Sequence, residues 1–397
     1  MKKIRDIEIW MLLVIMLLTA CSDNSGGGSE ETEDCFLNIY VYAPGRPMLT
    51  RADVGEIAHR EVAESRVHTL QIWVFKHDGG NLVGYLNATP TILNESDGHE
   101  MFRMKVAKEF ADHPENVDVY VVANAESVGL TLGENTERDD LDAVKIGTAY
   151  FGVTNLYGKD DLLPTTGRIS TAGLPMSGIE KDQPIYGSFP ALRIGSQEKM
   201  TTVQLTRAVS KLRFVLCRIE SEQKKELVRI DGIQLDEGMI PTASYLMPVA
   251  NPSYTTIGYV STAINYGSVA KETIPPVANP MDYAYETQTA QEYENLINTA
   301  IGSGQLTEIG PTYLRESDKQ LTGTIQYTVR AKNASENEPQ ATTTFSMAAP
   351  GDFLRNRSWI IYIFYMDAKI HVLTVTDMGV KSWTPDNNDD DRDLYNW

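Results

Sequence analysis

Hydrophobic and polar residues alternate with a period of two along much of this 397-residue chain. Because successive side chains of a strand point to opposite faces of a sheet, this alternation predicts strands with one buried face. The first such segment is Phe36–Tyr42, in which Leu37, Ile39 and Val41 share one face. Further segments with a strand pattern are Val67–Phe75, Leu82–Leu86, Phe102–Val106, Val117–Ala123, Met200–Ile219, Leu227–Leu235, Thr322–Arg330, Trp359–Tyr365 and Ile370–Val375.

Turn signals separate these segments, and helical patterns are scarce. Asp78-Gly79-Gly80 predicts a hairpin turn, because glycine readily adopts the positive φ angles of tight turns. A second hairpin is expected around Asp367-Ala368, and only Glu137–Ile146 and Gln288–Ile301 have a helical pattern. Short strands with turns between them are typical of antiparallel β-sandwiches, so the predicted fold class is all-β.

The N-terminus has the pattern of an export signal. Basic residues precede the uncharged stretch Ile9–Ala20, which as a helix would be about 18 Å long, too short for a ~30 Å hydrocarbon core. Residues 1–20 therefore resemble a signal peptide rather than a membrane span. Leu18–Cys21 is similar to a lipobox, which predicts cleavage between Ala20 and Cys21 and a lipid such as palmitate on Cys21. An ordinary cleavable signal followed by a chance cysteine is the alternative.

The residues after Cys21 cannot bury apolar surface. Residues 21–34 combine a Gly/Ser run with several acidic side chains, so we predict a flexible acidic tether. Acidic residues soon after a lipidated cysteine also resemble the surface-export signal of Bacteroides-type lipoproteins. This resemblance implies a location outside the outer membrane.

The length of the chain favours two domains. Without the signal peptide about 375 residues remain, more than a single hydrophobic core usually serves. The stretch Tyr150–Pro190 has little periodicity and is rich in Gly, Pro and Thr, and long strand patterns restart near residue 200. We therefore predict one β-sandwich domain over residues 35–199 and a second, in tandem, over residues 200–397.

The charge balance excludes one class of partner. The chain has 54 acidic and 35 basic residues, for a formal net charge of −19. Phosphate binding needs a basic surface, so nucleic acid is not an expected partner. Two cysteines remain besides Cys21, namely Cys35 and Cys217. They could pair in an oxidising compartment, but they fall in segments predicted to be different strands, and the unpaired state is favoured.

The sequence shows no motif of catalysis or of cofactor binding. The six histidines form no HExxH motif and no close pair at ligand spacing, so neither a metal site nor a cofactor is predicted. Asp386–Asp391 resembles a calcium loop, but an EF-hand would need glycine in place of Asp391 and glutamate in place of Trp397, and an acidic tail is favoured. Carboxylates are numerous enough for a glycosidase pair, yet no two of them stand out. The chain is therefore not predicted to be an enzyme.

Five segments resemble, in the same order, motifs of the fimbrillin-type subunits of type V fimbriae in Bacteroides-like bacteria. They are Thr50-Arg51-Ala52, Val67–Phe75 with Asp78-Gly79, Leu174–Gly178 (LPMSG), Leu205–Lys211 (LTRAVSK), and Arg355-Asn356 with Trp359–Tyr365, Val380 and Trp383. Each segment alone also fits an ordinary strand or turn, whereas the ordered set spans nearly the whole mature chain.

The resemblance implies two transthyretin-like antiparallel β-sandwich domains, export as a lipoprotein, and assembly into a surface fimbria that mediates adhesion. In that family an arginine-specific protease removes the first strand, and a strand of another subunit fills the groove. Carried over to this chain, the cleaved bond is Arg51–Ala52, and the displaced strand carries Leu37, Ile39 and Val41. Arg46–Pro47 is disfavoured because proline follows the arginine.

A donor strand is expected in the C-terminal segment. Its candidate residues are Val372, Val375 and Val380, ahead of Trp383, and the acidic run Asp386–Asp391 would have to lie beyond an apolar groove. The expected partners are other fimbrial subunits, the outer membrane through the lipid, and a host or bacterial receptor that the sequence does not identify.

Three other functions stay open at this stage. An anchor subunit would keep its lipid and its first strand, although a shaft or tip subunit is favoured. A surface glycan-binding lipoprotein would present exposed aromatic side chains, which the 19 tyrosines and five tryptophans permit. Most of these lie in alternating strands, where packing is their expected use. A carbohydrate-active enzyme is the third alternative.

Overall fold

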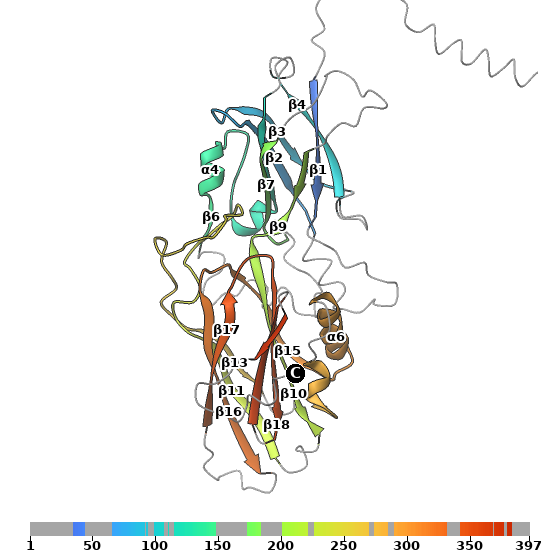
Figure 1. Cartoon of the computed structure of the whole chain (residues 1–397), viewed down its shortest axis with the longest axis vertical. Coiled ribbons are helices and arrows are strands. Elements are labelled where there is room, and N and C mark those ends of the chain that lie inside the picture. Colours follow the sequence, from blue (N-terminus) through green and yellow to red (C-terminus); the bar gives the residue numbers. More distant parts are fainter. Residues whose placement is uncertain are drawn as a thin grey trace, which may run out of the picture. The chain divides into compact units, whose positions relative to one another are not determined.

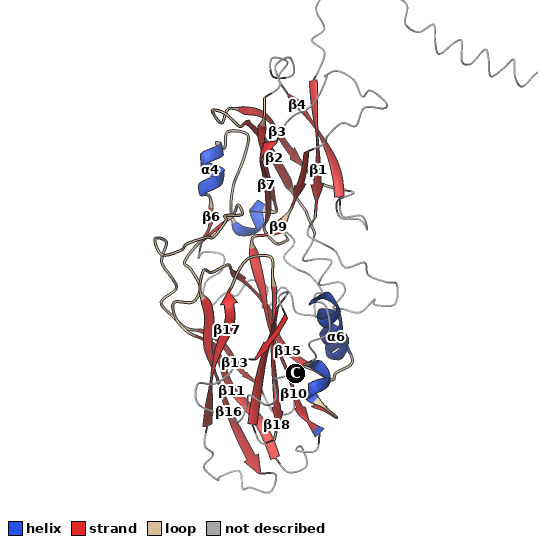
Figure 2. Ribbon diagram, viewed as in Figure 1, coloured by secondary structure: helices blue, strands red, loops and turns tan. Residues whose placement is uncertain are grey.

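The computed structural model describes residues 35–43, 66–91, 93, 99–106, 110, 115–147, 173–183, 201–220, 226–269, 274–284, 290–331, 342–367, 369–376 and 379–382. Strands make up most of the regular structure in these ranges, and helices are few and short (Figure 2). The chain is therefore an all-β protein, as the alternation predicts.

The strands and helices have the following bounds. The strands of the first half are β1 Cys35–Tyr42, β2 Leu70–Lys76, β3 Leu82–Ala88, β4 His99–Val106, β5 Val117–Ala123, β6 Lys145–Ile146 and β7 Met176–Gln183. The later strands are β8 Thr201–Gln204, β9 Thr206–Arg207, β10 Val209–Ile219, β11 Glu226–Leu235, β12 Ser244–Tyr245, β13 Ile264–Val269, β14 Pro276–Val277, β15 Thr307–Arg315, β16 Gln320–Ala331, β17 Thr342–Asp352, β18 Ser358–Met366, β19 Lys369–Thr376 and β20 Gly379–Ser382. The helices are the 3-10 helices η2 Ala125–Val128 and η4 Pro280–Tyr283 and the α-helices α4 Arg138–Ala143 and α6 Ala290–Gly302.

Two sheets enclose the first hydrophobic core (Figure 1). One has the strand order β4-β1-β8 and the other the order β3-β2-β5-β7-β9. Ile39 and Val203 from the first sheet and Ile72 and Val121 from the second are all fully buried in one cluster. The inward positions of β1, Leu37, Ile39 and Val41, are those that the alternation predicts.

The β2–β3 hairpin has the turn that the sequence predicts. Gly79 and Gly80 adopt φ angles of +83° and +68°, and Lys76 N donates to Asn81 O at 2.8 Å. Residues with a Cβ rarely adopt this left-handed region, so glycine is required at this turn.

The second face of β2 is buried as well. Gln71 and Trp73 are 6% and 0% exposed. The loop after η2 covers them, because Gln71 Nε2 donates to Leu132 O and Trp73 Nε1 donates to Gly133 O, each at 2.9 Å. A loop that packs across a sheet leaves no periodic signal, so the sequence does not predict this cover.

Two further sheets and one helix build the second core region. The sheet β14-β10-β18-β19-β20, in which β15 also pairs with β10, packs against the sheet β13-β11-β16-β17. The opposite face of β10 and β18 lies under α6 and η4, where Val215 and Tyr362 join Tyr293 and Ile297 of α6. Burial on both faces explains why β18 (SWIIYIFYM) is a nearly uninterrupted apolar run.

A charged cluster is buried under α6. Arg213 of β10, 1% exposed, contacts Glu308 at 2.5 Å, Asn298 at 2.7 Å and Glu294 at 3.4 Å. Burial alone would raise the pKa of Glu294, but the charges of Lys211 and Arg213 outweigh it and hold this pKa at about 2. Buried charges need such partners, so the cluster fixes α6 over β10.

Three strand pairs are parallel, whereas the sequence predicts antiparallel sheets. They are β1–β8, β10–β14 and β10–β18, and the other pairs among the described strands are antiparallel. Parallel neighbours need long connections. Local turn signals indicate hairpins and contain no information about such distant pairs.

Other differences lie in segments of weak periodicity. β7 falls inside Tyr150–Pro190, the stretch in which the sequence shows little periodicity. The helix expected over Glu137–Ile146 ends at Ala143, because Val144 is extended and Lys145-Ile146 pairs with β12. The helix expected over Gln288–Ile301 is confirmed as α6.

The two core regions meet along one nearly continuous run of strand. Val203 and Val209 belong to the first core, and Leu212 and Phe214 of β10 belong to the second. By its backbone contacts, Cys35–Trp397 forms one compact unit. A division into two domains near residue 200 stays a prediction.

Cys217 is a free cysteine buried in β10, so it does not pair with Cys35. Burial raises the pKa of its thiol to about 12, and the sulfur lies 2.9 Å from the Tyr362 hydroxyl. A thiol in this environment stays protonated and unreactive.

Candidate functional site

β1 is the middle strand of its sheet. On one side it pairs antiparallel with β4 along its whole length, from Cys35 opposite Val106 to Tyr42 opposite His99. On the other side, Ile39–Tyr42 pairs in parallel with β8. Figure 1 shows β1 (blue) beside β4 (cyan). Removal of such a strand would leave two edges with unpaired N–H and C=O groups facing each other.

The side chains of β1 alternate between core and surface. Leu37, Ile39 and Val41 are 7%, 0% and 0% exposed and belong to the first core, whereas Tyr40 and Tyr42 are half-buried. Full burial of each aliphatic side chain stabilises the folded state by ~1.5–3 kcal/mol. Because a folded domain is stable by only ~5–15 kcal/mol, β1 contributes a large share of the stability of the first core.

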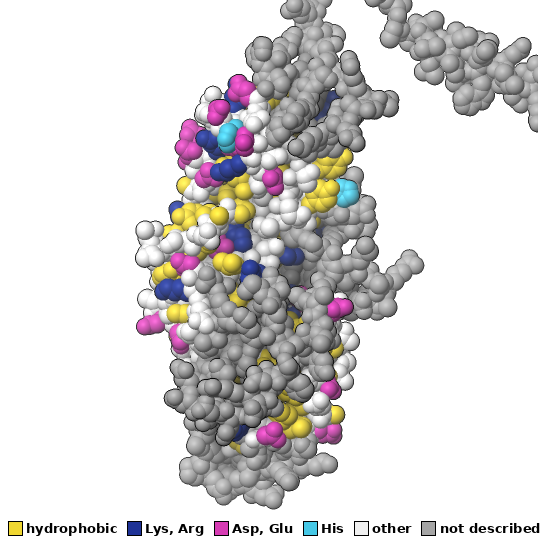
Figure 3. Space-filling view, viewed as in Figure 1, with side chains coloured by type: hydrophobic (Ala, Val, Ile, Leu, Met, Phe, Trp, Pro, Cys, Tyr) yellow, Lys and Arg dark blue, Asp and Glu magenta, His cyan; other side chains and the backbone are white. Residues whose placement is uncertain are grey.

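The outer face of this sheet is mixed in character. The Tyr42 ring stacks on His99 with 5.2 Å between centroids, and Met101 is 46% exposed nearby on β4. On the face drawn in Figure 3, acidic, basic and hydrophobic side chains of the described residues are interspersed. Neither sign of charge dominates the described part of the face drawn in Figure 3.

Two glycines bring β4 and β8 against the opposite sheet. A Cβ built at Gly84 of β3 would lie 2.6 Å from Met104 Sδ and 3.1 Å from Lys105 O of β4. A Cβ built at Gly178 of β7 would lie 2.5 Å from the carbonyl oxygen of Gln204 in β8. β4 therefore also contacts β3, and β8 also contacts β7, in addition to their pairing with β1. β4 and β8, the two walls of the site, are each packed on a strand of the opposite sheet.

The predicted processing residues Ala20, Cys21, Arg51 and Ala52 lie outside the described residues. Ala43 is the last described residue after β1, and Arg51 follows eight positions later. The candidate cleavage site is therefore close in sequence to the C-terminal end of β1.

The candidate donor residues lie in strands of the chain's own second half, and Val372 belongs to the second core. Val372 and Val375 lie in β19 and Val380 in β20, with Val375 opposite Val380. Val372 is 1% exposed because it packs in the second core, and β19 lies between β18 and β20. Donation of β19 would withdraw these contacts from the chain that supplies it. Within the described strands, β20 pairs with β19 alone.

Three of the sequence motifs meet at the point where the chain passes from the first core to the second. Met176-Ser177 of LPMSG pairs with Thr206-Arg207 of LTRAVSK. The Asn356 side chain accepts from Arg207 N at 3.3 Å and from Arg207 NH1 at 3.2 Å, and Asn356 N donates to Val209 O at 2.9 Å. Sequence order alone does not reveal this meeting point, since the segments are far apart in the chain.

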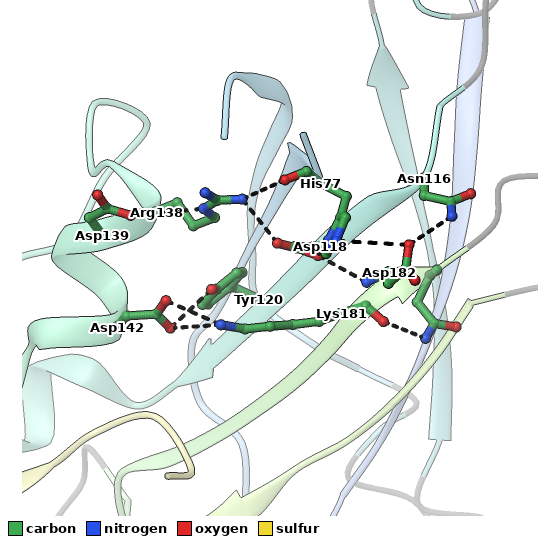
Figure 4. A network of polar contacts seen from close by, with 10 residues as sticks. His77, Asn116, Asp118, Tyr120, Arg138, Asp139, Asp142, Lys181 and Asp182 are labelled. Atoms are coloured by element: carbon green, nitrogen blue, oxygen red, sulfur yellow. Dashed lines mark hydrogen bonds and ion pairs between the residues drawn. The ribbon is translucent and has the colours of Figure 1, made fainter. Parts of the chain in front are cut away.

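A charged network links the end of β2, β5, β7 and α4 (Figure 4). The Asp118 carboxylate interacts with His77 Nδ1 at 2.7 Å and accepts from Arg138 NH1 at 3.2 Å and from Asp182 N at 2.9 Å. Arg138 also donates to His77 O at 2.9 Å. The network therefore ties the end of β2, β5, β7 and α4 together.

The network shifts the pKa of two of its members. The hydrogen bond to Asp118 raises the pKa of His77. Burial opposes ionisation of Asp118, but the bonds from His77 and from Asp182 N, with the charges of His77 and Arg138, leave its pKa below the usual value. Both shifts favour the ion pair in the folded state.

A surface hollow of about 480 Å³ lies beside the fifth motif, at Arg355-Asn356. Its lining is Thr206, Pro248, Val249, Asn251, Pro252, Glu316, Asp318, Leu354, Arg355, Asn356 and Arg357, without an aromatic side chain. The large hydrophobic side chains exposed in the described part of the chain are Leu82, Met101 and Val249. Stacking on sugars needs an accessible ring, and no aromatic residue whose burial the structure describes is fully exposed.

The histidines that the structure describes are used in packing and hydrogen bonding. His77 contacts Asp118, and His371 stacks on Phe364 with 4.9 Å between centroids. In the described ranges no three His, Cys, Asp or Glu side chains are grouped so that they could hold a metal ion. No described helix has the length and apolar character needed to cross a membrane.

The comparisons with known proteins give matches among solved structures only. No protein-family model matches the chain, and no curated protein matches it. The chain is similar to a fimbrial assembly protein from Parabacteroides distasonis, with 13% identity and a TM-score of 0.44 over 89% of this chain and 99% of that one. It is similar to the tip fimbrial protein Mfa3 from Porphyromonas gingivalis, with 14% identity and a TM-score of 0.41 over 88% and 100%. It is also similar to the fimbrial anchor protein Mfa2 from Porphyromonas gingivalis, with 8% identity and a TM-score of 0.37 over 88% and 100%.

Proposed function

We propose that this chain is a structural subunit of a surface fimbria, assembled by replacement of its first strand with a strand of another subunit. The observation that carries the proposal is the position of β1, a short strand between β4 and β8 whose Leu37, Ile39 and Val41 fill the first core. Any strand with the same alternation could supply equivalent backbone hydrogen bonds and apolar contacts. The ordered motifs of the sequence support the same assignment.

Cleavage at Arg51–Ala52 is the proposed activation step. It would remove the covalent link between β1 and the rest of the chain while leaving the buried contacts of Ile39 and Val41 in place. The cut subunit would therefore stay closed until a donor displaces β1. This order of events protects an apolar groove from water and from non-specific association.

The proposed donor to a neighbouring subunit is the C-terminal segment with Val372, Val375 and Val380. Val372 is buried in its own core, so the part around Val380 in β20 would be released at a lower cost. The partners are then other fimbrial subunits, and adhesion to a host or bacterial surface is a property of the assembled fibre.

We further propose that the chain is exported as a lipoprotein attached to the outer membrane through Cys21 and that it has no catalytic residue of its own. A shaft or tip position requires loss of β1. An anchor subunit is the second candidate, because the lipobox-like Leu18–Cys21 would equally serve a chain that keeps its lipid and its first strand.

The test is immunogold electron microscopy of the native host with and without the gene, together with isolated monomer in a glycan-binding assay. Labelled fibres in the wild type alone, and fibre preparations that contain this chain, are the expected result. Saturable glycan binding by the monomer, with no labelled fibres, would instead establish a surface lectin.

A further inference from the structure

We propose that the groove accepts its donor strand in one direction only, that of β1, and that Gln204 at the end of β8 is the residue that holds the end of the donor. The inference rests on the proposed function, and it concerns how a donor is held rather than whether exchange occurs.

The two walls of the groove are unequal, and this inequality favours one direction. β4 pairs with all eight residues of β1, from Cys35 to Tyr42, and does so antiparallel. β8 pairs with four residues, Ile39–Tyr42, in parallel. Antiparallel pairing is the more stable kind per residue, so the direction of β1 gives the longer wall the stronger pairing. A reversed donor would have parallel pairing along the longer wall and antiparallel pairing only along the shorter one.

Gln204 captures the C-terminal end of β1. Its Nε2 donates to Ala43 O at 2.9 Å and to Leu205 O at 3.2 Å, and it lies 3.4 Å from Tyr42 O. The backbone N–H of the next residue, Leu205, donates to Tyr42 O at 2.8 Å. Two successive carbonyl groups at the end of the strand therefore meet two donors. This small subsite recognises the backbone of the strand end, whatever its side chains.

The subsite is held in place by the opposite sheet. The backbone of Gln204 packs so closely on Gly178 of β7 that no Cβ fits between them. The Gln204 side chain itself is exposed, which leaves it accessible to an incoming strand. This close contact supports the Gln204 backbone on the side of β7, and the proposal requires the amide to stay at the end of the groove when β1 leaves.

The captured end of β1 is also the end nearest Arg51. After cleavage this end is a free terminus and is the first part that can fray. A neutral hydrogen bond changes an equilibrium by about two- to tenfold. Gln204 should therefore slow the loss of β1 from the cut subunit, and it should slow the loss of a donor by the same factor.

The probe for a test is a fluorescent synthetic peptide with the sequence of residues 36–43, added in excess to the full chain cut after Arg51. In β1, Tyr42 lies opposite His99 and Asn38 lies opposite Arg103. Peptides with Tyr42→Cys or Asn38→Cys are therefore offered to chains with His99→Cys or Arg103→Cys under mild oxidation. Cys217 is buried and does not compete, and Cys21 and Cys35 are replaced by serine in every chain used.

The expected result is capture of the Tyr42→Cys peptide by His99→Cys and of the Asn38→Cys peptide by Arg103→Cys. A reversed donor on the same face would exchange these partners and overturn the proposal. Release of the peptide should be about two- to tenfold faster from Gln204→Met than from the parent chain. Thr202→Val is the matched control, since Thr202 lies on the same exposed face of β8 opposite Tyr40, and its release rate should be unchanged.

The outcomes separate this inference from the proposed function. Exchange with swapped crosslinks would refute the single direction of the donor. Exchange with equal release rates for Gln204→Met and Thr202→Val would refute the role of Gln204. Either result leaves strand replacement standing. A cut chain that takes up no peptide at all would refute both. Circular dichroism of the variants before cutting shows whether each one is folded.

Discussion

A Cβ atom on Gly178 would stand 2.5 Å from the carbonyl oxygen of Gln204, so the backbones of β7 and β8 touch although the two strands belong to different sheets. Gly178 is the last residue of the LPMSG segment, and this contact explains why a residue without a Cβ stands at that position. It lets β7 support the wall of the groove at the point where β1 ends.

Substitution of Gly178 by valine should destabilise the uncut chain by about 1–3 kcal/mol, the usual cost of forcing extra atoms into a packed site. Urea unfolding followed by tryptophan fluorescence measures the change. Gly133→Ala is the control, because a Cβ there would meet nothing within 4 Å. Equal unfolding midpoints for Gly178→Val and the parent would show that β7 and β8 can separate freely.

Ile39→Ala should lower the free energy of unfolding of the uncut chain by about 2–5 kcal/mol, since it leaves a cavity in the core. Ile39 is 0% exposed in the first core. Asn38→Ala, on the outer face of the same strand, should cost far less. A small effect of Ile39→Ala would mean that β1 contributes little to the first core, and a groove would then not need a donor.

The His77–Asp118 pair predicts a pH dependence of stability. The pKa of His77 is raised in the folded state by its bond to Asp118. The stabilisation is therefore complete below the unfolded pKa of about 6.5 and is lost as the pH rises through the higher folded value. The lowered pKa of Asp118 has its effect at acidic pH. The stabilisation that Asp118 contributes is present above its unfolded pKa and is lost as the pH falls through the lower folded pKa.

Urea midpoints measured from pH 5 to pH 9 test this pair. The parent chain should lose stability above neutral pH more steeply than His77→Gln, which cannot bind the proton. In an Asp118→Asn background, the His77→Gln substitution should change the pH profile little. Identical profiles for the parent and His77→Gln would show that His77 does not contribute to the pH dependence of stability.

The sequence predicts the strands of this chain better than their partners. Alternation locates β1, β2, β5 and β18, because a half-buried or fully buried strand leaves a periodic or continuous apolar pattern. It gives the inward face of β1 directly from Leu37, Ile39 and Val41. Partners are set by contacts between distant segments, so the parallel pairing of β1 with β8 has no local signal.

The supports of the site were equally hidden in the sequence. Gly178 and Gln204 are 26 positions apart and have no shared motif. Two signals point to Gly178: the LPMSG resemblance, and the rule that glycine in a strand suggests a close approach of another backbone. The role of Gln204 follows only from its hydrogen bonds to Ala43 and Leu205, which depend on the folded chain.

Lipidation at Cys21 gives a further prediction. Cys21→Ala should leave unprocessed precursor that takes up no labelled palmitate, because the lipid is attached to the cysteine thiol. Cys35→Ala is the matched control and should be labelled like the wild type. Labelling and outer-membrane fractionation that persist in Cys21→Ala would show that Cys21 is not the lipidated residue.

The last prediction concerns cleavage at Arg51. Leu37, Ile39 and Val41 each contribute ~1.5–3 kcal/mol of burial, so an intact chain should remain a closed monomer. Wild type in the native host should yield SDS-resistant ladders whose subunits begin at Ala52. Arg51→Ala should stay monomeric with Phe36–Tyr42 still attached, since the covalent link keeps β1 at a very high effective concentration beside its groove.

Two controls make this experiment specific. Arg46→Ala removes the other nearby arginine, whose bond to Pro47 is a poor substrate, and its ladders should equal those of the wild type. Arg51→Lys keeps the positive charge but removes the arginine side chain, so an arginine-specific protease should leave it as monomer. N-terminal sequencing of the ladder bands identifies the cut directly. Undiminished ladders in Arg51→Ala would rule out this activation route, and an anchor subunit that keeps its first strand would become the better assignment.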